Sequence, residues 1–342
     1  MKILGIESSC DECAAAIVED GKRILSNVVA TQIPFHTRYN GVVPEIASRI
    51  HTEWIYSVVE EALNTANLGP TEIEGVAATA QPGLLGSLLV GLNFAKAFAW
   101  SRQIPFIAVD HMLAHLYASR LADTDLNYPF LGLLVSGGHT IICRVDAFDM
   151  VTVLGTSIDD AVGEAFDKVS KHYGFGYPGG AIIDKLAQNG DDSAFEFPLP
   201  SLHKGEHRYD VSYSGLKTAV INQLEQFRRK GDSAASDTET ANIAASFQKT
   251  AVEILLRALF RAVEDTGLTS IVAGGGVAAN SYLRFRLAEH GELRCIFPPM
   301  NLCGDNGAMI AGLGYQYLAR GDKSPLSVVA SARVKAFKRR YR

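Results

Sequence analysis

The sequence predicts an α/β protein built from two similar lobes. Residues 2–18 and 130–145 share one pattern, an apolar strand followed by a short polar turn and a second apolar strand. A pattern that returns at the scale of a domain indicates a duplicated fold. Around these segments, short apolar runs alternate with helical patterns, which favours sheets that are at least partly parallel. The 342 residues are enough for two domains of usual size.

The elements of the first half follow from apolar periodicity and from turn residues. The helix expected at 49–67 has one apolar face and ends at Gly69-Pro70, and Asp110 is placed to cap the helix that follows it. Asp20-Gly21 reads as a hairpin turn. Strands are expected at 2–6, 13–18, 75–80 and 104–109, and helices at 49–67, 84–101 and 111–121.

The second half is expected to hold a hairpin, a long insertion and a final pair of strand–helix units. Residues 189–214 are polar and rich in turn residues, and 230–237 read as a flexible link. We expect lobes at 1–125 and 126–325, an insertion near 189–265 and a basic tail at 326–342. Strands are expected at 130–135, 141–145, 151–154, 270–273 and 293–297, and helices at 158–173, 181–188, 216–229, 239–266, 278–290 and 303–320.

Composition excludes several classes of protein. The formal charge of -5, from 32 basic and 37 acidic residues, argues against a wholly basic nucleic-acid binder. Five cysteines without regular spacing do not make a disulfide scaffold. The longest apolar run is interrupted by Ser87, Asn93 and Lys96, so no membrane span is predicted. Because no signal peptide is visible either, we expect a soluble cytoplasmic protein.

Two glycine turns are candidate phosphate sites. Ser136-Gly137-Gly138-His139-Thr140 joins two apolar strands, and backbone N–H groups in such a turn can form an anion-binding concavity. The run from Gly274 to Asn280, GGGVAAN, leads from a strand into a helix, where N–H groups also attract anions. Each could instead be an ordinary hairpin or a packed turn. Together with the polar turn after residue 6, they favour a nucleotide cleft between two lobes.

Two histidines are candidate metal ligands. His111 and His115 lie four residues apart at the start of a predicted helix, so their rings can share one face. With Asp305, which begins a later predicted helix, they can hold a divalent metal. The alternative is a pair of surface histidines. The zinc-protease motif is excluded because Met112 stands where that motif needs glutamate.

Other polar residues give weaker signals. Asp11 and Glu12 lie in a tight turn, where carboxylates can hold a cation or take a proton, or can simply be solvated. We interpret the spacing of Cys10 and Cys13 as incidental. A glycine loop at 177–180 followed by Asp184 can grip a hydroxyl or amino group. The acidic residues of the 158–173 helix read mostly as a solvated face, and the basic tail as either disordered or in contact with phosphates.

Several motifs together resemble one family. The chain is similar, over nearly its whole length, to the TsaD family of bacterial tRNA threonylcarbamoyladenosine transferases, formerly described as glycoproteases. The order of the motifs is more specific than any one of them. They are GIESSCDE at 5–12, GVVPEIASRIH at 41–51, QPGLLGSLLVG at 81–91, HMLAH at 111–115, LVSGGHT at 134–140, DDAVGEAFDK at 159–168, YPGG at 177–180, SGLKT at 214–218, GGGVAAN at 274–280 and CGDNGAMIA at 303–311.

The resemblance implies an actin-like fold of two lobes, each with an RNase H-like core, and a nucleotide cleft between them. It implies transfer of the threonylcarbamoyl group from threonylcarbamoyl-AMP to N6 of adenosine 37, with release of AMP, in tRNAs that read codons beginning with A. It implies iron(II) on His111, His115 and Asp305, and catalytic roles for Asp11 and Glu12. The implied substrate site consists of Leu134, Val135, Ser136, Gly137, Gly138, Asp167, Gly180, Asp184 and Asn280.

The resemblance also implies partners and leaves alternatives. Expected partners are tRNA, the proteins TsaB and TsaE, and a TsaC-type enzyme that supplies the adenylate, with an adenine nucleotide in the cleft and zinc or magnesium able to replace iron in vitro. The sequence departs from the family pattern in having Cys13 where Thr or Ser is expected, and an apolar Leu113-Ala114 between the histidines. Other readings are an actin-like ATP-dependent small-molecule kinase, a metalloprotease and a non-enzymatic scaffold related to Hsp70.

Overall fold

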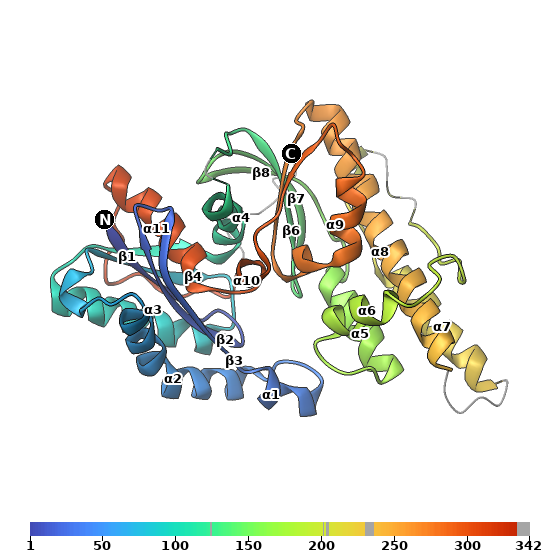
Figure 1. Ribbon diagram of the computed structural model, residues 1–342, viewed down its shortest axis with the longest axis horizontal. Coiled ribbons are helices and arrows are strands. Elements are labelled where there is room, and N and C mark those ends of the chain that lie inside the picture. The colour runs from blue at the N-terminus through green and yellow to red at the C-terminus, as the bar shows by residue number, and fades with distance from the viewer. Residues whose placement is uncertain (124, 201, 203–204, 230–235, 334–342) are drawn as a thin grey trace. The chain divides into compact units, whose positions relative to one another are not determined.

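The computed structural model describes residues 1–123, 125–200, 202, 205–229 and 236–333 (Figure 1). It divides into two compact units. The first contains residues 1–128, 146–151 and 298–342, and the second contains 129–145 and 152–297. These units differ from the expected lobes, because the chain after residue 297 belongs to the first unit and not to the second. The predicted link at 230–237 and the basic tail fall mostly outside the described residues.

The first unit is built on a five-stranded sheet in the order β3-β2-β1-β4-β5. β1 pairs antiparallel with β2 and parallel with β4, while β2 pairs antiparallel with β3 and β4 parallel with β5. The predicted strands are present, and β3, which was not predicted as a strand, forms the edge. The strands are β1 (Lys2–Glu7), β2 (Glu12–Glu19), β3 (Arg23–Thr31), β4 (Gly75–Gln81) and β5 (Phe106–Asp110).

Alternation along β1 sends its side chains to two helical layers. Leu4 and Ile6 belong to the core that the strands form with α2 (Pro44–Thr65) and α3 (Leu85–Arg102). Gly5 faces the other way, where a Cβ would lie 2.4 Å from the backbone nitrogen of Ala311 in α11 (Gly307–Arg320). This close packing places α11 in the first unit. It also means that Glu7, two residues after Gly5, points to the α11 face.

The remaining helices of the first unit are short or lie at its edges. α4 (His111–Ala122) begins directly after β5 and packs against α11. α1 (Ile33–His36), η1 (Thr37–Tyr39), η2 (Pro70–Glu72) and α10 (Met300–Cys303) are single turns. The helix predicted at 303–320 is wrong at its start, since residues 304–306 are not helical and separate α10 from α11. Asn306 begins α11, and its side chain accepts a hydrogen bond from the Met309 amide.

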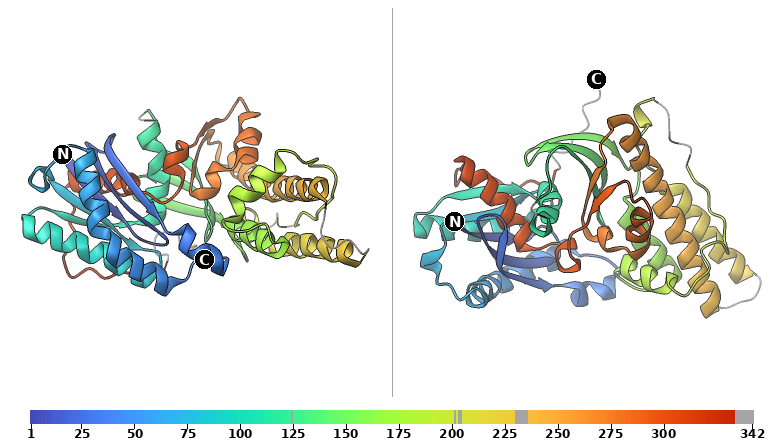
Figure 2. Two further views of the ribbon diagram at one scale, coloured as in Figure 1. Left: turned by 60° about the horizontal axis from the view of Figure 1, so that its bottom comes forward. Right: turned by 45° about the horizontal axis from the view of Figure 1, so that its top comes forward.

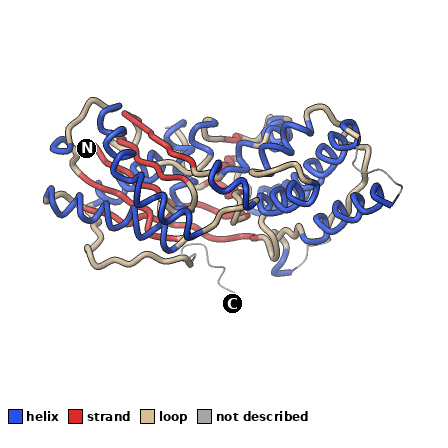
Figure 3. The backbone as a smooth tube through the Cα atoms, turned by 90° about the horizontal axis from the view of Figure 1, so that it is seen from below, coloured by secondary structure: helices blue, strands red, loops and turns tan. Residues whose placement is uncertain are grey.

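The second unit repeats the sheet topology of the first. Its order is β10-β9-β6-β7-β8, so its first strand again has an antiparallel hairpin partner on one side and a parallel partner on the other. This confirms the duplication predicted from the two strand–turn–strand segments. Figure 3 shows the strands of each unit as a layer with helices against it. The strands are β6 (Phe130–Val135), β7 (Thr140–Ala147), β8 (Met150–Thr156), β9 (Ser270–Gly274) and β10 (Arg294–Ile296).

Helices cover the sheet of the second unit with a large apolar core. In that core the rings of Phe166 and Phe247 meet edge to face at 4.9 Å, and each buried ring contributes roughly 1.5–3 kcal/mol. The views of Figure 2 show the long helices α7 and α8 side by side. The helices are α5 (Val162–Tyr173), α6 (Gly179–Ala187), η3 (Gly205–His207), α7 (Ser214–Arg229), α8 (Asp237–Thr266), η4 (Gly276–Ala279) and α9 (Ser281–Ala288).

Two predicted helix starts in this unit are wrong. The helix expected from residue 158 begins at Val162, because Asp159 and Asp160 accept hydrogen bonds from α5 itself and from the segment at 212–217 instead of lying on a solvated helix face. Asp159 accepts from the Tyr213 amide at 2.8 Å, and Asp160 accepts from Lys168 and Lys217. The helix expected from residue 278 begins after a 3₁₀ turn, at Ser281.

No helix of the described chain has both the length and the apolar character that crossing a bilayer requires. All five cysteines are free thiols, including the Cys10 and Cys13 pair.

Candidate functional site

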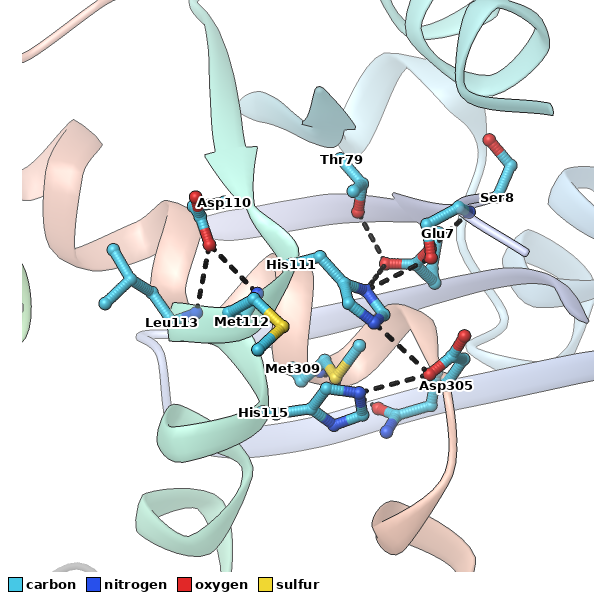
Figure 4. A network of polar contacts seen from close by, with 12 residues as sticks. Glu7, Ser8, Thr79, Asp110, His111, Met112, Leu113, His115, Asp305 and Met309 are labelled. Carbon is cyan, nitrogen blue, oxygen red and sulfur yellow. Dashed lines mark hydrogen bonds and ion pairs between the residues drawn. The ribbon is translucent and has the colours of Figure 1, made fainter. Parts of the chain in front are cut away.

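The histidine pair is positioned by the junction of β5 and α4. Asp110 ends the strand and caps the helix, accepting hydrogen bonds from the amides of Met112 at 2.9 Å and Leu113 at 3.3 Å. With the helix start fixed, the residues one turn apart share a face as the sequence predicted. The rings of His111 and His115 lie 4.5 Å apart, edge to face (Figure 4). His115 is buried, which excludes the alternative of two surface histidines.

Asp305 completes a group of three metal-type ligands. It lies in the break between α10 and α11, and its Oδ1 is 3.1 Å from His115 Nε2 and 3.5 Å from His111 Nε2. One ligand atom from each residue lies within 4.8 Å of the other two (Figure 4). Two imidazoles and a carboxylate are a donor set suited to iron(II) or zinc. The structure therefore brings together the three residues that the sequence singled out.

Glu7 is a member of this site that the sequence reasoning missed. It is fully buried at the end of β1, and its Oε2 is 3.0 Å from Nδ1 of His111 and 2.5 Å from the Thr79 hydroxyl, which donates to it (Figure 4). Its Oε1 accepts a hydrogen bond from the Ser9 amide. A carboxylate on one ring nitrogen of a histidine orients the other nitrogen toward a metal. A glutamate ending an apolar strand beside two serines was the available signal.

The carboxylates around His111 set its charge in the metal-free protein. Burial alone would lower the pKa of His111, but the charges of Glu7 and Asp305 outweigh it and raise that pKa to about 10. Conversely, burial would raise the pKa of Asp305, but His111 and His115 hold it at about 2. The pKa of Glu7 is also lowered, since His111 offsets the effect of its burial. The site thus concentrates ionised groups in a buried place.

Asp11 lies in the same turn as Ser9, between β1 and β2, and Glu12 is the first residue of β2. The Asp11 carbonyl accepts a hydrogen bond from the Gln32 amide at 3.0 Å, and the Thr31 hydroxyl donates to Glu12 at 3.3 Å. Nε2 of the buried His51 lies 3.0 Å from the Cys10 carbonyl. Burial, together with the charges of Asp305 and Asp11, raises the pKa of Glu12 to about 9.

The second group of predicted residues lies in the second unit, around the turn after β6. Leu134 and Val135 are buried strand residues. The turn closes through two bonds, from the Ser136 amide to the His139 carbonyl at 2.8 Å and from the His139 amide to the Ser136 hydroxyl at 3.1 Å. A Cβ on Gly137 or Gly138 would meet no described protein atom within 4 Å. These two residues therefore present open backbone, as an anion cradle requires.

The glycine turn after β9 packs directly on the turn after β6. Gly275 has φ +93, and a Cβ there would lie 2.4 Å from the carbonyl oxygen of Val135. Only glycine tolerates both the backbone conformation and the approach. A Cβ on the neighbouring Gly276 would meet no described atom within 4 Å. The two glycine turns thus form one surface at the ends of adjacent parallel strands, where α/β sheets commonly bind ligands.

The other predicted substrate residues hold this surface together. Asn280 caps α9 by accepting from the Leu283 amide, and its Nδ2 donates to Asp184 at 3.1 Å. Asp184 also accepts from the Ser281 hydroxyl at 2.7 Å. Asp167 accepts from the Gly179 amide at 2.7 Å, which fixes the start of α6. Gly180 lies beside it in open space.

The two sheets of equal strand order define the class of protein. A component of (R)-2-hydroxyglutaryl-CoA dehydratase from Acidaminococcus fermentans aligns with 93% of this chain and 99% of its own, at a TM-score of 0.54 and 15% identity. HypF of T. kodakarensis aligns with 93% of this chain and 48% of its own, at a TM-score of 0.59 and 15% identity. These likenesses show the fold, which is that of the actin-like α/β proteins.

Sequence similarity then gives the family. The model of the family TsaD, tRNA N6-adenosine threonylcarbamoyltransferase, matches residues 23–312. Proteins of that name are 66% identical over all 342 residues in Treponema denticola, covering the whole of both chains, and 51% identical in Borreliella burgdorferi, covering this whole chain and 97% of that protein. The chain belongs to the TsaD family, which confirms the resemblance found in the sequence.

Proposed function

We propose that this chain transfers the threonylcarbamoyl group of threonylcarbamoyl-AMP to N6 of adenosine 37, in tRNAs that read codons beginning with A. The observation that carries the proposal is 66% identity over the full length to a protein named tRNA N6-adenosine threonylcarbamoyltransferase. In this acyl transfer the bond from N6 to the carbamoyl carbon forms, the bond from that carbon to the phosphate oxygen breaks, and AMP leaves. A tRNA substrate implies a cytoplasmic enzyme.

The residues present fit a divalent metal. His111, His115 and Asp305 would hold it, because their ligand atoms converge and Glu7 engages the nitrogen of His111 that faces away from Asp305. Iron(II) is the metal that we infer from the family resemblance and the donor set, and zinc or magnesium can replace it in vitro. When bound, the metal supplies Lewis-acid polarisation of the acyl or phosphoryl oxygens.

The glycine turns of the second unit are proposed to bind the adenylate. The backbone at Gly137 and Gly138 is open, so its N–H groups can stabilise the phosphate as negative charge develops on the departing AMP. The hydrogen bond from Asn280 to Asp184 keeps the turn after β9 in place. The bond from the Gly179 amide to Asp167 likewise holds the loop before Gly180. These residues position the leaving group, and an adenine nucleotide is expected in the same place.

A carboxylate at the turn after β1 is proposed to take the proton that N6 loses. Asp11 is our choice, since it is buried and its backbone is fixed by the amide of Gln32. Glu12, beside it, is the weaker candidate, because a carboxyl whose pKa is raised to about 9 already carries its proton near neutral pH. Asp11 shares a turn with Ser9, whose hydroxyl lies 3.2 Å from His111 Nδ1, and Glu12 begins β2 directly after that turn. The proton acceptor and the proposed metal ligands are therefore parts of one structure within the first unit.

We propose TsaB and TsaE as protein partners, and a TsaC-type enzyme as the source of the adenylate.

The metal-ligand group does not favour the alternative of an actin-like kinase. Magnesium in kinases is held mainly by carboxylates and substrate phosphates, whereas this group offers two imidazoles. The relatives described above also carry the name of a transferase and not of a kinase.

The direct test supplies the purified protein, loaded with iron(II) and combined with its partners, with threonylcarbamoyl-AMP and an unmodified tRNA that reads a codon beginning with A. Digestion of the tRNA and mass spectrometry of its nucleosides should show threonylcarbamoyladenosine. A tRNA whose position 37 is guanosine is the matched control and should stay unmodified. Unmodified adenosine 37 in the complete mixture would reject the proposal.

A further inference from the structure

The second unit contains a cavity of about 230 Å³ that none of the predicted site residues lines. One helix, α8, supplies Ile254, Arg257 and Arg261, which lie on one face because they are three and four residues apart. At roughly 30 Å³ per water, the volume exceeds what a single ion needs. The remaining lining residues come from the segment before α7, and they are Leu199, Pro200, Leu202 and Asp210.

The two arginines of the cavity have unused hydrogen-bond donors. Arg257 is exposed and forms no hydrogen bond or ion pair with any residue in the described part of the chain. Arg261 donates from Nη2 to the Leu202 carbonyl at 3.2 Å, but its Nε is buried and has no partner among the described atoms. A buried donor without a partner costs free energy unless a ligand or water satisfies it.

Two acids near the cavity, Asp265 and Asp210, are already engaged, and the exposed Glu264 of α8 also acts on Arg261. Asp265 pairs with Arg208 through two bonds of 2.5 and 2.8 Å. Asp210 lines the cavity, yet its Oδ2 lies 2.7 Å from His207 Nδ1 and its Oδ1 accepts from the Thr156 amide at 2.9 Å. Burial and the guanidinium groups of Arg208 and Arg257 lower the pKa of Arg261, and together they outweigh the charges of Asp265 and Glu264, which raise it.

We propose that Arg257 and Arg261 bind backbone phosphates of the tRNA substrate. This inference rests on the proposed function, because a polyanionic substrate is what a chain of net charge -5 needs local positive sites to hold. Guanidinium groups match phosphate oxygens with two parallel donors. The apolar walls formed by Leu199 and Ile254 leave room for the sugar beside the phosphate. Such contacts position the RNA and carry no sequence information.

The test compares Arg257→Gln with Arg102→Gln. Arg102 is likewise exposed and unpaired among the described residues, but it lies in the last turn of α3 in the first unit. Because Arg257 forms no hydrogen bond or ion pair with a described residue, its replacement should leave the folded state intact, and an unchanged thermal midpoint would check this. We expect Arg257→Gln to weaken binding of unmodified tRNA several-fold at low salt, and to reduce the slope of log affinity against log salt by about 0.7–0.9.

Steady-state assays of the complete enzyme separate this inference from the proposed function. If the wild-type protein modifies tRNA, Arg257→Gln should raise KM for tRNA while kcat is retained, and Arg257→Lys should restore part of the loss. Unchanged tRNA affinity and salt slope in an active enzyme would overturn the phosphate site alone. Equal losses in Arg102→Gln, or weakened binding of inorganic phosphate without any change for tRNA, would overturn it too. A wild-type protein without activity would overturn the proposed function instead.

Discussion

The polar turn after β1 and the glycine turn after β6 occupy the same place in two sheets of the same strand order, yet they are built for opposite charges. Directly before the turn after β1, Glu7 is fully buried, accepts a hydrogen bond from Thr79 and lies near His111, so carboxylates and imidazoles fill the space. In the second turn, Gly137 and Gly138 leave the backbone open. We therefore propose that one copy of the duplicated unit binds a cation and takes a proton, and that the other binds an anion.

The proposed function assigns the two turns to different parts of one reaction. Strand order fixes where each turn lies, but side chains decide what each turn binds. In the first unit a helix and a loop from distant parts of the chain add His111, His115 and Asp305 to the turn. In the second unit the glycine turn after β9 adds its backbone to the turn after β6, and Asp184 holds that turn by accepting a hydrogen bond from Ser281. The predictions below test this division.

The largest effect is expected from binding a metal at His111, His115 and Asp305. Adding iron(II) without oxygen to metal-free protein, at a free concentration about 100 times the dissociation constant, should stabilise the folded state by about 2.7 kcal/mol. A rise of several degrees in the thermal midpoint would report it. His115→Ala should show no rise, whereas His172→Ala, an exposed histidine on α5, should behave as wild type. Equal responses of the two variants would contradict a metal site at the triad.

The buried carboxylate behind His111 is expected to tune the site. Glu7→Gln keeps the size of the side chain but removes its charge, so metal affinity should fall about 10- to 100-fold. Equilibrium dialysis against a metal buffer measures this. Glu53→Gln, at an exposed position of α2, is the matched control and should not change the affinity. Undiminished affinity in Glu7→Gln would mean that Glu7 has only a packing role.

Packing of the second site can be tested at adjacent glycines. Gly275→Ala forces an alanine into a left-handed conformation and brings its Cβ against the Val135 carbonyl, so it should cost at least about 1–3 kcal/mol of unfolding free energy. Gly276→Ala meets nothing and should cost far less. Denaturant unfolding of both variants gives the comparison. Similar losses at the two positions would show that the turns are not packed as described.

The smallest effect on stability is expected at the open turn itself. Gly137→Ala adds a methyl that touches no described atom, so the free energy of unfolding should change by less than about 0.5 kcal/mol. The same methyl stands on the proposed anion cradle and should weaken AMP binding in a calorimetric titration. Gly291→Ala, which also meets nothing and lies away from the turns, is the control. Wild-type AMP affinity in Gly137→Ala would separate this turn from the nucleotide.

The sequence predicted most elements of both sheets, because short apolar runs bounded by polar turns are local signals. It did not predict β3 as a strand or the break before α11. β3 is an edge strand with mixed burial, and the break depends on the Asn306 cap together with the packing of Gly307 against the backbone of β2. Asp159 was misplaced on a helix because its partners, Ser212 to Ser214, are more than fifty residues away.

The candidate site was predicted in its ligands but not in its supports. The spacing of His111 and His115 is a local pattern, and Asp305 was a candidate third ligand because it begins a later predicted helix; the family resemblance implied the same three residues. The role of Glu7 depends on the alternation of β1 toward α11 and on the position of α4, which only the folded chain reveals. The cavity at Arg257 and Arg261 likewise combines α8 with a distant turn-rich segment that has no periodic pattern.

Metal content tests the central claim that His111, His115 and Asp305, beside the turn after β1, form a cation site. Wild-type protein and His115→Ala are loaded with iron(II) under the same oxygen-free conditions, freed of unbound metal and analysed by atomic emission. We predict one iron per wild-type chain and essentially none in His115→Ala, with the same circular dichroism for both proteins. An equal metal content in the two proteins, or none in the wild type, would contradict the assignment of His111, His115 and Asp305 as ligands.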